Sequence, residues 1–116
     1  MADDCIFCRV ASGQTDTPLL YEDDAVVAFA DIRPIAPTHI LVVPKAHHAT
    51  LVEAAHQADR ATLGRLLEAA GKIAREKLGN DESCRVVINN GAKAGQTVYH
   101  LHLHLLSGRH FGWPPG

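Results

Sequence analysis

The sequence predicts an α+β fold, in which an antiparallel sheet of about five strands packs with one long helix and one or two short ones. Residues 99–106 alternate histidine with large apolar side chains, which is the two-residue period of a strand. Residues 58–78 instead repeat apolar side chains at intervals of three and four, as an amphipathic helix does. Two short apolar runs around an acidic turn indicate an antiparallel hairpin near the N-terminus.

The N-terminal half is expected to hold a short helix and three strands. Residues 5–12 place Ile6, Phe7 and Val10 at helical spacing, and Gly13 closes that helix. The strands are predicted at residues 19–22, 25–31 and 38–44, with Glu22-Asp23-Asp24 as the turn of the hairpin. The prolines of residues 33–37 require a loop before the third strand, because each lacks an N–H and restricts its predecessor.

The C-terminal half is expected to hold the long helix and two further strands. Gly79 and Asn80 would end the helix, whose buried face comprises Leu63, Leu66, Leu67, Ala70, Ile73, Ala74 and Leu78. Residues 85–89 form the next strand, with Val86, Val87 and Ile88 buried and Cys84 beside it interpreted as a core residue. The glycine- and proline-rich tail, residues 107–116, cannot be a helix or a central strand.

Composition limits the class of protein. The 116 residues make one domain, 1–116, with no room for a second. The net charge is −2 and the basic residues are scattered, so neither a nucleic-acid groove nor a membrane patch is expected. No apolar run is long enough for a transmembrane helix and no signal peptide is recognisable, so the three cysteines fit a reducing cytoplasm.

Three histidines on one strand face have three interpretations. They form a solvated polar face, a zinc-binding HxH pair, or a catalytic group in which one neutral imidazole is the nucleophile. The preceding loop, residues 89–97, favours the third, because its glycines and amide and hydroxyl side chains can turn donors toward a phosphate. The sequence has no Walker-type motif and no acidic pair near the histidines. Magnesium-dependent phosphoryl transfer is therefore not expected.

This arrangement resembles the histidine triad (HIT) family of nucleotide-binding proteins. His100-Leu101-His102-Leu103-His104-Leu105-Leu106 matches the His-X-His-X-His-X-X signature of that family, and residues 95–99 are similar to the segment that leads into it. The resemblance extends to Asp31-Ile32, to residues 37–45 and to the terminal residues 113–116. It therefore covers nearly the whole chain and implies the HIT-like fold.

The resemblance implies a role for each site residue. His102 would attack the α-phosphorus of a nucleotide, with His100, His104 and, behind them, His39 completing the catalytic set. The phosphate and leaving group would be bound by His104, Asn89, Gly95, Gln96 and Thr97, next to Val98. Asp31 would accept hydrogen bonds from the ribose, and the base would lie among Ile6, Phe7, Val10, Phe29, Ile32 and Leu41. In relatives with a similar ending the tail reaches the partner's active site in a homodimer, which gives Trp113 a substrate-side position.

A Cys-X-X-Cys pair at the start of the chain has its own alternatives. Cys5 and Cys8 are a zinc half-site, a redox pair or two small buried residues. Bacterial-type relatives bind zinc through such a pair, a histidine after the Pro-Lys-X segment and the first histidine of the triad, which correspond to His47 and His100 here. A zinc ion with four protein ligands would be structural, and no cofactor is expected for catalysis itself.

The expected function is hydrolysis of the P–N bond in purine nucleoside 5′-phosphoramidates, with AMP- or GMP-like substrates, through a nucleotidyl intermediate on His102. The ending Trp113-Pro114-Pro115-Gly116 resembles the phosphoramidate-hydrolysing branch, whereas the Cys-X-X-Cys start resembles bacterial-type members. A dinucleoside polyphosphate hydrolase or nucleotidyl transferase with the same intermediate is the first alternative. A nucleotide-binding interaction module is the second.

Overall fold

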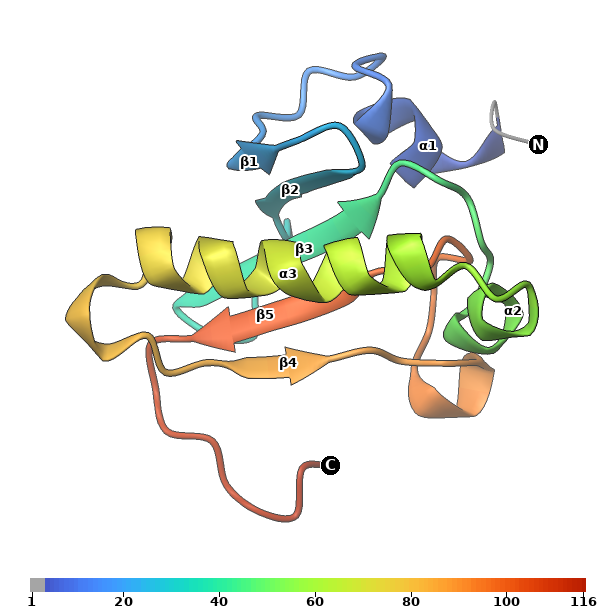
Figure 1. Ribbon diagram of the computed structural model, residues 1–116. Coiled ribbons are helices and arrows are strands. Elements are labelled where there is room, and N and C mark those ends of the chain that lie inside the picture. The colour runs from blue at the N-terminus through green and yellow to red at the C-terminus, as the bar shows by residue number, and fades with distance from the viewer. Residues whose placement is uncertain (1–3) are drawn as a thin grey trace.

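The computed structural model describes residues 4–116, which form five strands and several helices (Figure 1). The strands are β1 (Tyr21–Glu22), β2 (Val26–Ala30), β3 (Thr38–Pro44), β4 (Arg85–Val87) and β5 (Leu103–Ser107). The α-helices are α1 (Ile6–Ala11), α2 (Leu51–His56) and α3 (Arg60–Lys77), and the 3-10 turns are η2 (Gly79–Asp81) and η3 (Ala92–Ala94). All neighbouring strands are antiparallel in the order β1-β2-β3-β5-β4, which confirms the predicted α+β class.

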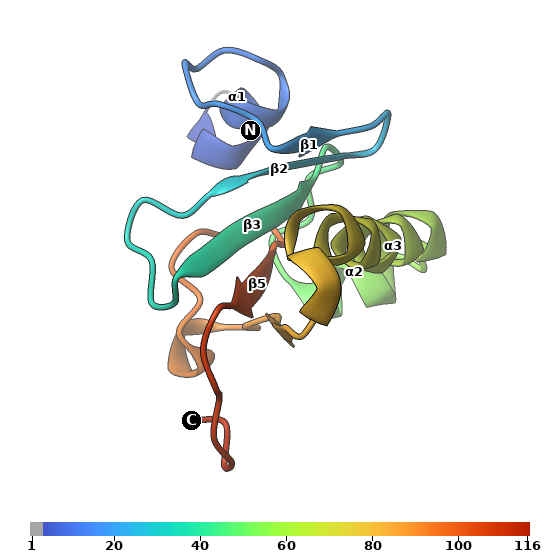
Figure 2. The same cartoon turned by 90° about the vertical axis from the view of Figure 1, so that its left-hand side faces the viewer.

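Each face of the sheet has its own apolar core. The α3 helix lies along one face, seen on the right of the sheet in Figure 2. Alternate strand residues such as Val26, Ile40 and Leu105 pack against it, and all of them are buried. The other face carries α1, whose Phe7 and Val10 pack on the intervening residues of β2 and β3. The two-residue period of the strands thus sends one set of side chains to α3 and the other to α1.

The histidine segment is only partly a strand. β5 begins at Leu103 rather than at residue 99, so His100 and His102 precede the ladder and only His104 lies within it. Leu101, Leu103 and Leu105 are fully or almost fully buried on the α3 side, as their spacing predicts. His100 and His102 lie near Phe7 of α1, with ring centroids 6.1 and 5.0 Å away.

The strand predicted at residues 85–89 is shorter and more exposed than expected. β4 ends at Val87 and pairs only with β5, because it is the edge of the sheet. Val86 is 43% exposed, Val87 and Ile88 are half-buried, and Cys84 is exposed instead of lying in the core. The predicted burial of this apolar run is wrong, because an edge strand is covered less than a central one.

The second short helix is α2, for which the sequence predicts no residue range. Thr50 caps it, because its side-chain oxygen accepts a hydrogen bond from the N–H of Glu53 at 3.1 Å. Glu53 in turn accepts from the N–H of Ala49 at 3.2 Å. Thr50-Leu51-Val52-Glu53 has the Ser/Thr-X-X-Glu spacing of a capping box, which is the signal that predicts this helix.

The long helix was predicted at 58–78 and is observed at Arg60–Lys77, with Gly79 in the left-handed region at φ 72°. Leu66, Ala70 and Ile73 are buried as expected, but Leu67 is 57% exposed. A neighbour of Leu66 in sequence is turned about 100° around the helix axis, which carries it off the buried stripe.

Two leucine-to-alanine substitutions should separate these environments. Leu105→Ala should lower the free energy of unfolding by about 2 to 5 kcal/mol, because Leu105 is fully buried and its loss leaves a cavity. Leu67→Ala removes the same atoms from a mostly exposed position and should change it by less than about 0.5 kcal/mol. Urea denaturation followed by circular dichroism measures both, and equal losses would contradict this account of the core.

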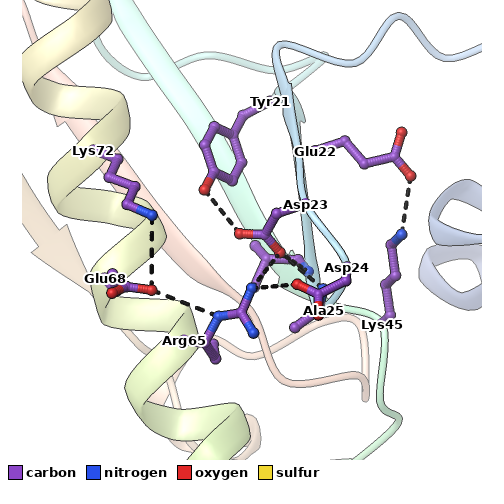
Figure 3. Close-up of polar contacts among 10 residues, drawn as sticks. Tyr21, Glu22, Asp23, Asp24, Ala25, Lys45, Arg65, Glu68 and Lys72 are labelled. Carbon is purple, nitrogen blue, oxygen red and sulfur yellow. Dashed lines mark hydrogen bonds and ion pairs between the residues drawn. The ribbon is translucent and has the colours of Figure 1, made fainter.

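An ionic network joins the β1–β2 turn to α3 (Figure 3). The guanidinium of Arg65 pairs with Asp24 and with Oδ1 of Asp23, the latter at 3.2 Å. Asp23 also accepts hydrogen bonds from the N–H groups of Ala25 and Val26 and from the hydroxyl of Tyr21. The acidic turn therefore closes the hairpin and is fastened to the helix by one arginine.

No helix within residues 4–116 combines the length and the apolar character needed to cross a membrane.

The tail is shorter than predicted, because Ser107 is the last residue of β5 and donates a hydrogen bond to the carbonyl of Ser83 at 2.7 Å.

Candidate functional site

An apolar cleft of about 520 Å³ lies between α1 and the sheet. Phe7 and Phe29 meet edge to face in its wall, with ring centroids 5.6 Å apart. All six residues expected around the base line it: Ile6, Phe7, Val10, Phe29, Ile32 and Leu41. Ile32 is 93% exposed and stands at the rim. The cleft also reaches Asp31, Val98, His102 and His104, so an apolar compartment and the histidines are parts of one site.

His102 is held in one orientation by the backbone. Its Nδ1 lies 2.7 Å from the carbonyl oxygen of His100, and because a carbonyl only accepts, Nδ1 must carry the proton. Nε2 is therefore the nitrogen with the lone pair. Burial lowers the pKa of His102, and the ring of Phe7 packs against it edge-on. A neutral imidazole with one nitrogen fixed is suited to nucleophilic attack.

His104, His39 and Asp31 form a second polar group beside His102. Nε2 of His39 lies 2.9 Å from Nδ1 of His104 and 3.3 Å from Oδ2 of Asp31. The His102 and His104 rings are 5.1 Å apart between centroids. Burial, together with the neighbouring His102 and His39, lowers the pKa of His104 to about 4. All of these side chains project from the face of the sheet that carries α1.

A second hollow of about 620 Å³ adjoins the apolar cleft, and we name it the polar hollow for the charged and amide side chains among its lining residues. The two share Asp31, Arg33, Thr97 and His104, so His104 stands at their junction. Asn89, Arg85, Arg109 and the end of the tail also line the polar hollow. A ligand with an apolar ring at one end and a charged or polar group at the other would span both spaces.

The loop that leads into the histidines is built on two glycines. Gly91 and Gly95 have φ values of 93° and 95°, a region that other residues rarely adopt. Gln96 is buried, and its amide donates to the carbonyls of Ala49 and Val98 while its oxygen accepts from the N–H of Gly91. The side chain of Gln96 thus organises the loop, whereas Thr97 and Val98 line the apolar cleft.

The tail is fastened near the polar hollow rather than at the apolar cleft. Arg85 and Arg109 place their guanidinium groups 5.3 and 4.2 Å from the ring centre of Phe111. Arg85 also donates to the carbonyl of Gly112 at 2.8 Å. Trp113 is 84% exposed and does not line either space within the described chain.

Cys5, Cys8, His47 and His100 converge from three distant segments, with their ligand atoms all within 4.8 Å of one another. Nδ1 of His100 lies 3.3 Å from Sγ of Cys5, 3.4 Å from Sγ of Cys8 and 3.1 Å from Nδ1 of His47. In a tetrahedral zinc site with ordinary bond lengths, two nitrogens are about 3.3 Å apart and a nitrogen and a sulfur about 3.5 Å apart. The observed spacings are close to both values.

The donor chemistry of this cluster also fits zinc. Nε2 of His100 donates to the carbonyl of Pro44 at 2.8 Å, which leaves Nδ1 as the ligand atom. Zinc-bound histidines typically donate a hydrogen bond from the other ring nitrogen in this way. Burial and the adjacent Cys5 raise the pKa of Cys8 to about 11, so two neighbouring thiolates need a cation. The four residues fit a structural zinc ion with no open position.

Sequence reasoning missed some residues that border the site. Thr17 and Arg33 line the apolar cleft, although neither belongs to a recognisable motif. Arg33 could have been suspected, because it follows Asp31 at the start of the proline-rich loop. The backbone N–H of Ile35 lies 3.2 Å from Nδ1 of His39. This contact cannot be recognised from the sequence, because every residue other than proline has a backbone N–H.

Comparison with known proteins gives the same picture. The sequence model of the HIT domain matches residues 12–111. An uncharacterized HIT-like protein of Synechocystis is 48% identical over 116 residues, covering all of both chains. A 14 kDa zinc-binding protein of Brassica juncea is 44% identical over 97% of this chain and its own full length.

A solved structure is similar throughout. The crystal structure of a HIT family hydrolase from Legionella pneumophila superposes with a TM-score of 0.89 at 43% identity, covering 97% of this chain and 99% of that one. The histidine signature, the antiparallel fold and these similarities together show that the chain belongs to the HIT domain family.

Proposed function

We propose that the protein is a nucleotide-binding hydrolase that cleaves the P–N bond of purine nucleoside 5′-phosphoramidates, such as AMP joined to an amine. The observation that carries the proposal is the protonation of the His102 ring. Nδ1 donates a hydrogen bond to the carbonyl of His100, so Nε2 keeps its lone pair beside the cleft. The name of the Legionella neighbour, a HIT family hydrolase, supports the reaction class.

The proposed reaction has two displacements. The lone pair on Nε2 of His102 attacks the α-phosphorus, the P–N bond breaks, and its electron pair leaves with the amine, which takes up a proton. Thr97 has a hydroxyl at the junction of the two spaces that can supply this proton. Water then attacks the same phosphorus and returns a proton to the oxygen of Thr97, the bond from phosphorus to Nε2 of His102 breaks with its electron pair going back to the ring, and the nucleoside monophosphate is released.

The substrate would span both spaces of the site. The purine fits the apolar cleft among Phe7, Phe29 and Leu41, and the ribose hydroxyls would donate to Asp31. The phosphate would lie at His102 and His104, with Gly95 and Gln96 shaping the loop around it. The leaving group would enter the polar hollow beside Asn89 and Thr97.

One observation favours a second candidate. The polar hollow is lined by Arg33, Arg85 and Arg109, which would suit the anionic leaving group of a dinucleoside polyphosphate. The same covalent intermediate would serve that reaction. Initial rates on an AMP phosphoramidate and on a diadenosine polyphosphate, measured side by side, distinguish the two substrates.

Trapping the intermediate tests the reaction itself. After mixing with an AMP phosphoramidate, the protein should gain the mass of one nucleotidyl group within a turnover time. The quench should use denaturant at high pH, because phosphorus–nitrogen bonds are labile in acid. Peptide mapping should place the group on His102. An adduct at another residue, or hydrolysis with no adduct at any quench time, would contradict the mechanism.

We also propose a structural zinc ion at Cys5, Cys8, His47 and His100, supported by the geometry of that cluster and by the zinc-binding name of the Brassica relative. The metal would brace the backbone around His100, whose carbonyl orients His102. A homodimer is the proposed assembly, supported by the exposed edge strand β4 and by the exposed Trp113 of the tail.

A further inference from the structure

Asp31, His39 and His104 are close enough to form either a metal site or a chain of hydrogen bonds. Their ligand atoms lie within 4.8 Å of one another, which resembles the two-histidine, one-carboxylate set of some metal sites. The same atoms could instead form a chain of hydrogen bonds, with no metal involved. The choice depends on which ring nitrogen of each histidine carries the proton, since a metal needs a lone pair.

The backbone decides this for His39. The N–H of Ile35 points at Nδ1 of His39 across 3.2 Å. An amide N–H can only donate, so Nδ1 must be the acceptor and the proton of the neutral ring must be on Nε2. His39 is buried, so this amide has no competition from bulk water at the ring. A metal ion on Nε2 would move the proton to Nδ1 and set two donors against each other, which disfavours the metal reading.

The proton on His39 then determines the state of His104. Nε2–H of His39 has Nδ1 of His104 at 2.9 Å and Oδ2 of Asp31 at 3.3 Å, so the shorter bond runs to His104. Nδ1 of His104 is therefore an acceptor, and its own proton is on Nε2. Among residues 4–116, Nε2 of His104 has no hydrogen-bond partner, and the ring borders both spaces of the site.

His102 has the opposite arrangement, because its Nδ1 donates to the carbonyl of His100. We propose that the backbone amide of Ile35 is a positioning group that, through His39, holds His104 with Nε2–H toward the site, so that a lone pair on His102 stands next to a fixed donor on His104. The catalytic meaning of this pairing rests on the proposed function, since the donor would stabilise the charge that develops on the phosphate. The assignment of protons does not depend on it.

A matched pair of variants at residue 39 tests the chain of hydrogen bonds. The side chain of His39→Gln has an oxygen to accept from Ile35 and an NH₂ group to donate to His104, as the imidazole does. The side chain of His39→Glu has the same shape but, at a pH where its carboxyl group is ionised, only accepts, so in that state Nδ1 of His104 must acquire a proton. Long-range ¹H–¹⁵N correlation spectra of the imidazole rings distinguish protonated from unprotonated nitrogens in each protein.

The expected result is an unprotonated Nδ1 on His104 in the wild type and in His39→Gln, and a protonated one in His39→Glu. Hydrolysis should be about 100-fold slower in His39→Glu than in His39→Gln, because the donor toward the phosphate is lost. A protonated Nδ1 on His104 in the wild type, or the same ring spectrum in both variants, would overturn the proposal. If the spectra agree but no variant hydrolyses the substrate, the proposed function fails while the proton assignment stands.

A second pair tests the amide itself. Ile35→Pro removes the N–H, whereas Ile35→Ala keeps it and removes only the side chain, which is 63% exposed. His39 should gain a population protonated on Nδ1 in Ile35→Pro but not in Ile35→Ala. A direct measurement needs no substitution: coupling across the hydrogen bond should link the amide nitrogen of Ile35 to Nδ1 of His39. A His39 ring already protonated on Nδ1 in the wild type would overturn the role of this amide.

Discussion

Replacing His102 with alanine should lower the rate of phosphoramidate hydrolysis by about 10⁴-fold or more. The substitution removes the only atom proposed to bond to phosphorus, and Asp31, the carboxylate that lines the same cleft, is proposed to bind the ribose instead. Removal of a covalent nucleophile generally leaves only the residual effect of binding and oriented donors. Steady-state assays on an AMP phosphoramidate measure the loss.

The binding of AMP provides the internal control for this experiment. Calorimetry should give an affinity within about tenfold of wild type, because the apolar cleft and Asp31 are unchanged. His56→Ala is the matched variant, since it removes an exposed imidazole at the end of α2 and should leave turnover unaffected. Unchanged hydrolysis in His102→Ala would exclude the covalent mechanism, and loss of AMP binding would indicate damage to the fold instead.

Loss of the metal from the cluster of Cys5, Cys8, His47 and His100 should produce a large change in stability. We expect about one zinc ion per chain after purification without added metal, and close to none in Cys5→Ser. If the wild-type ion is held at about 1,000 times its dissociation constant, it contributes about 4 kcal/mol. For a chain of this size chelation should then lower Tm by about 15 °C. Metal analysis and differential scanning calorimetry measure the two effects.

Cys5→Ser removes one proposed zinc ligand while preserving the start of helix α1. Cys5 is the N-cap of α1 and accepts from the N–H of Cys8, and serine is a good N-cap, so the helix start is preserved. Cys84→Ser is the control, because it removes an exposed thiol outside the cluster and should retain both zinc and Tm. Zinc near zero in wild type and variant alike would remove the zinc proposal.

Elements with strong local signals could be predicted from the sequence almost to the residue. β3 has the predicted bounds, because Pro37 precedes it and Pro44 ends it around a continuous apolar run. The hairpin turn and α3 were also confirmed, since acidic turn residues and helical periodicity act over a few neighbouring positions. The start of β5 was wrong by several residues, because alternation of side chains does not require a ladder partner.

Burial was the weaker part of the prediction. Val86 and Cys84 have the character of core residues but lie at the sheet edge, and Leu67 is turned off the buried stripe of α3. Hydrophobicity along the chain says which side chains favour burial, but coverage depends on which element packs above them. Here α3 covers the middle of the sheet and leaves β4 at its margin.

From the sequence alone, the family, the fold class and the kinds of side chain at the site could be read, because signature spacing, periodicity and turn residues are local properties of the chain. Tertiary structure alone decided how the parts meet. It brought Cys5 and Cys8 to His47 and His100, joined two spaces at His104, and aimed the amide of Ile35 at His39. Those contacts depend on strand pairing and loop path over long separations, and hydrogen-bond direction, rather than residue identity, sets which nitrogen faces the site.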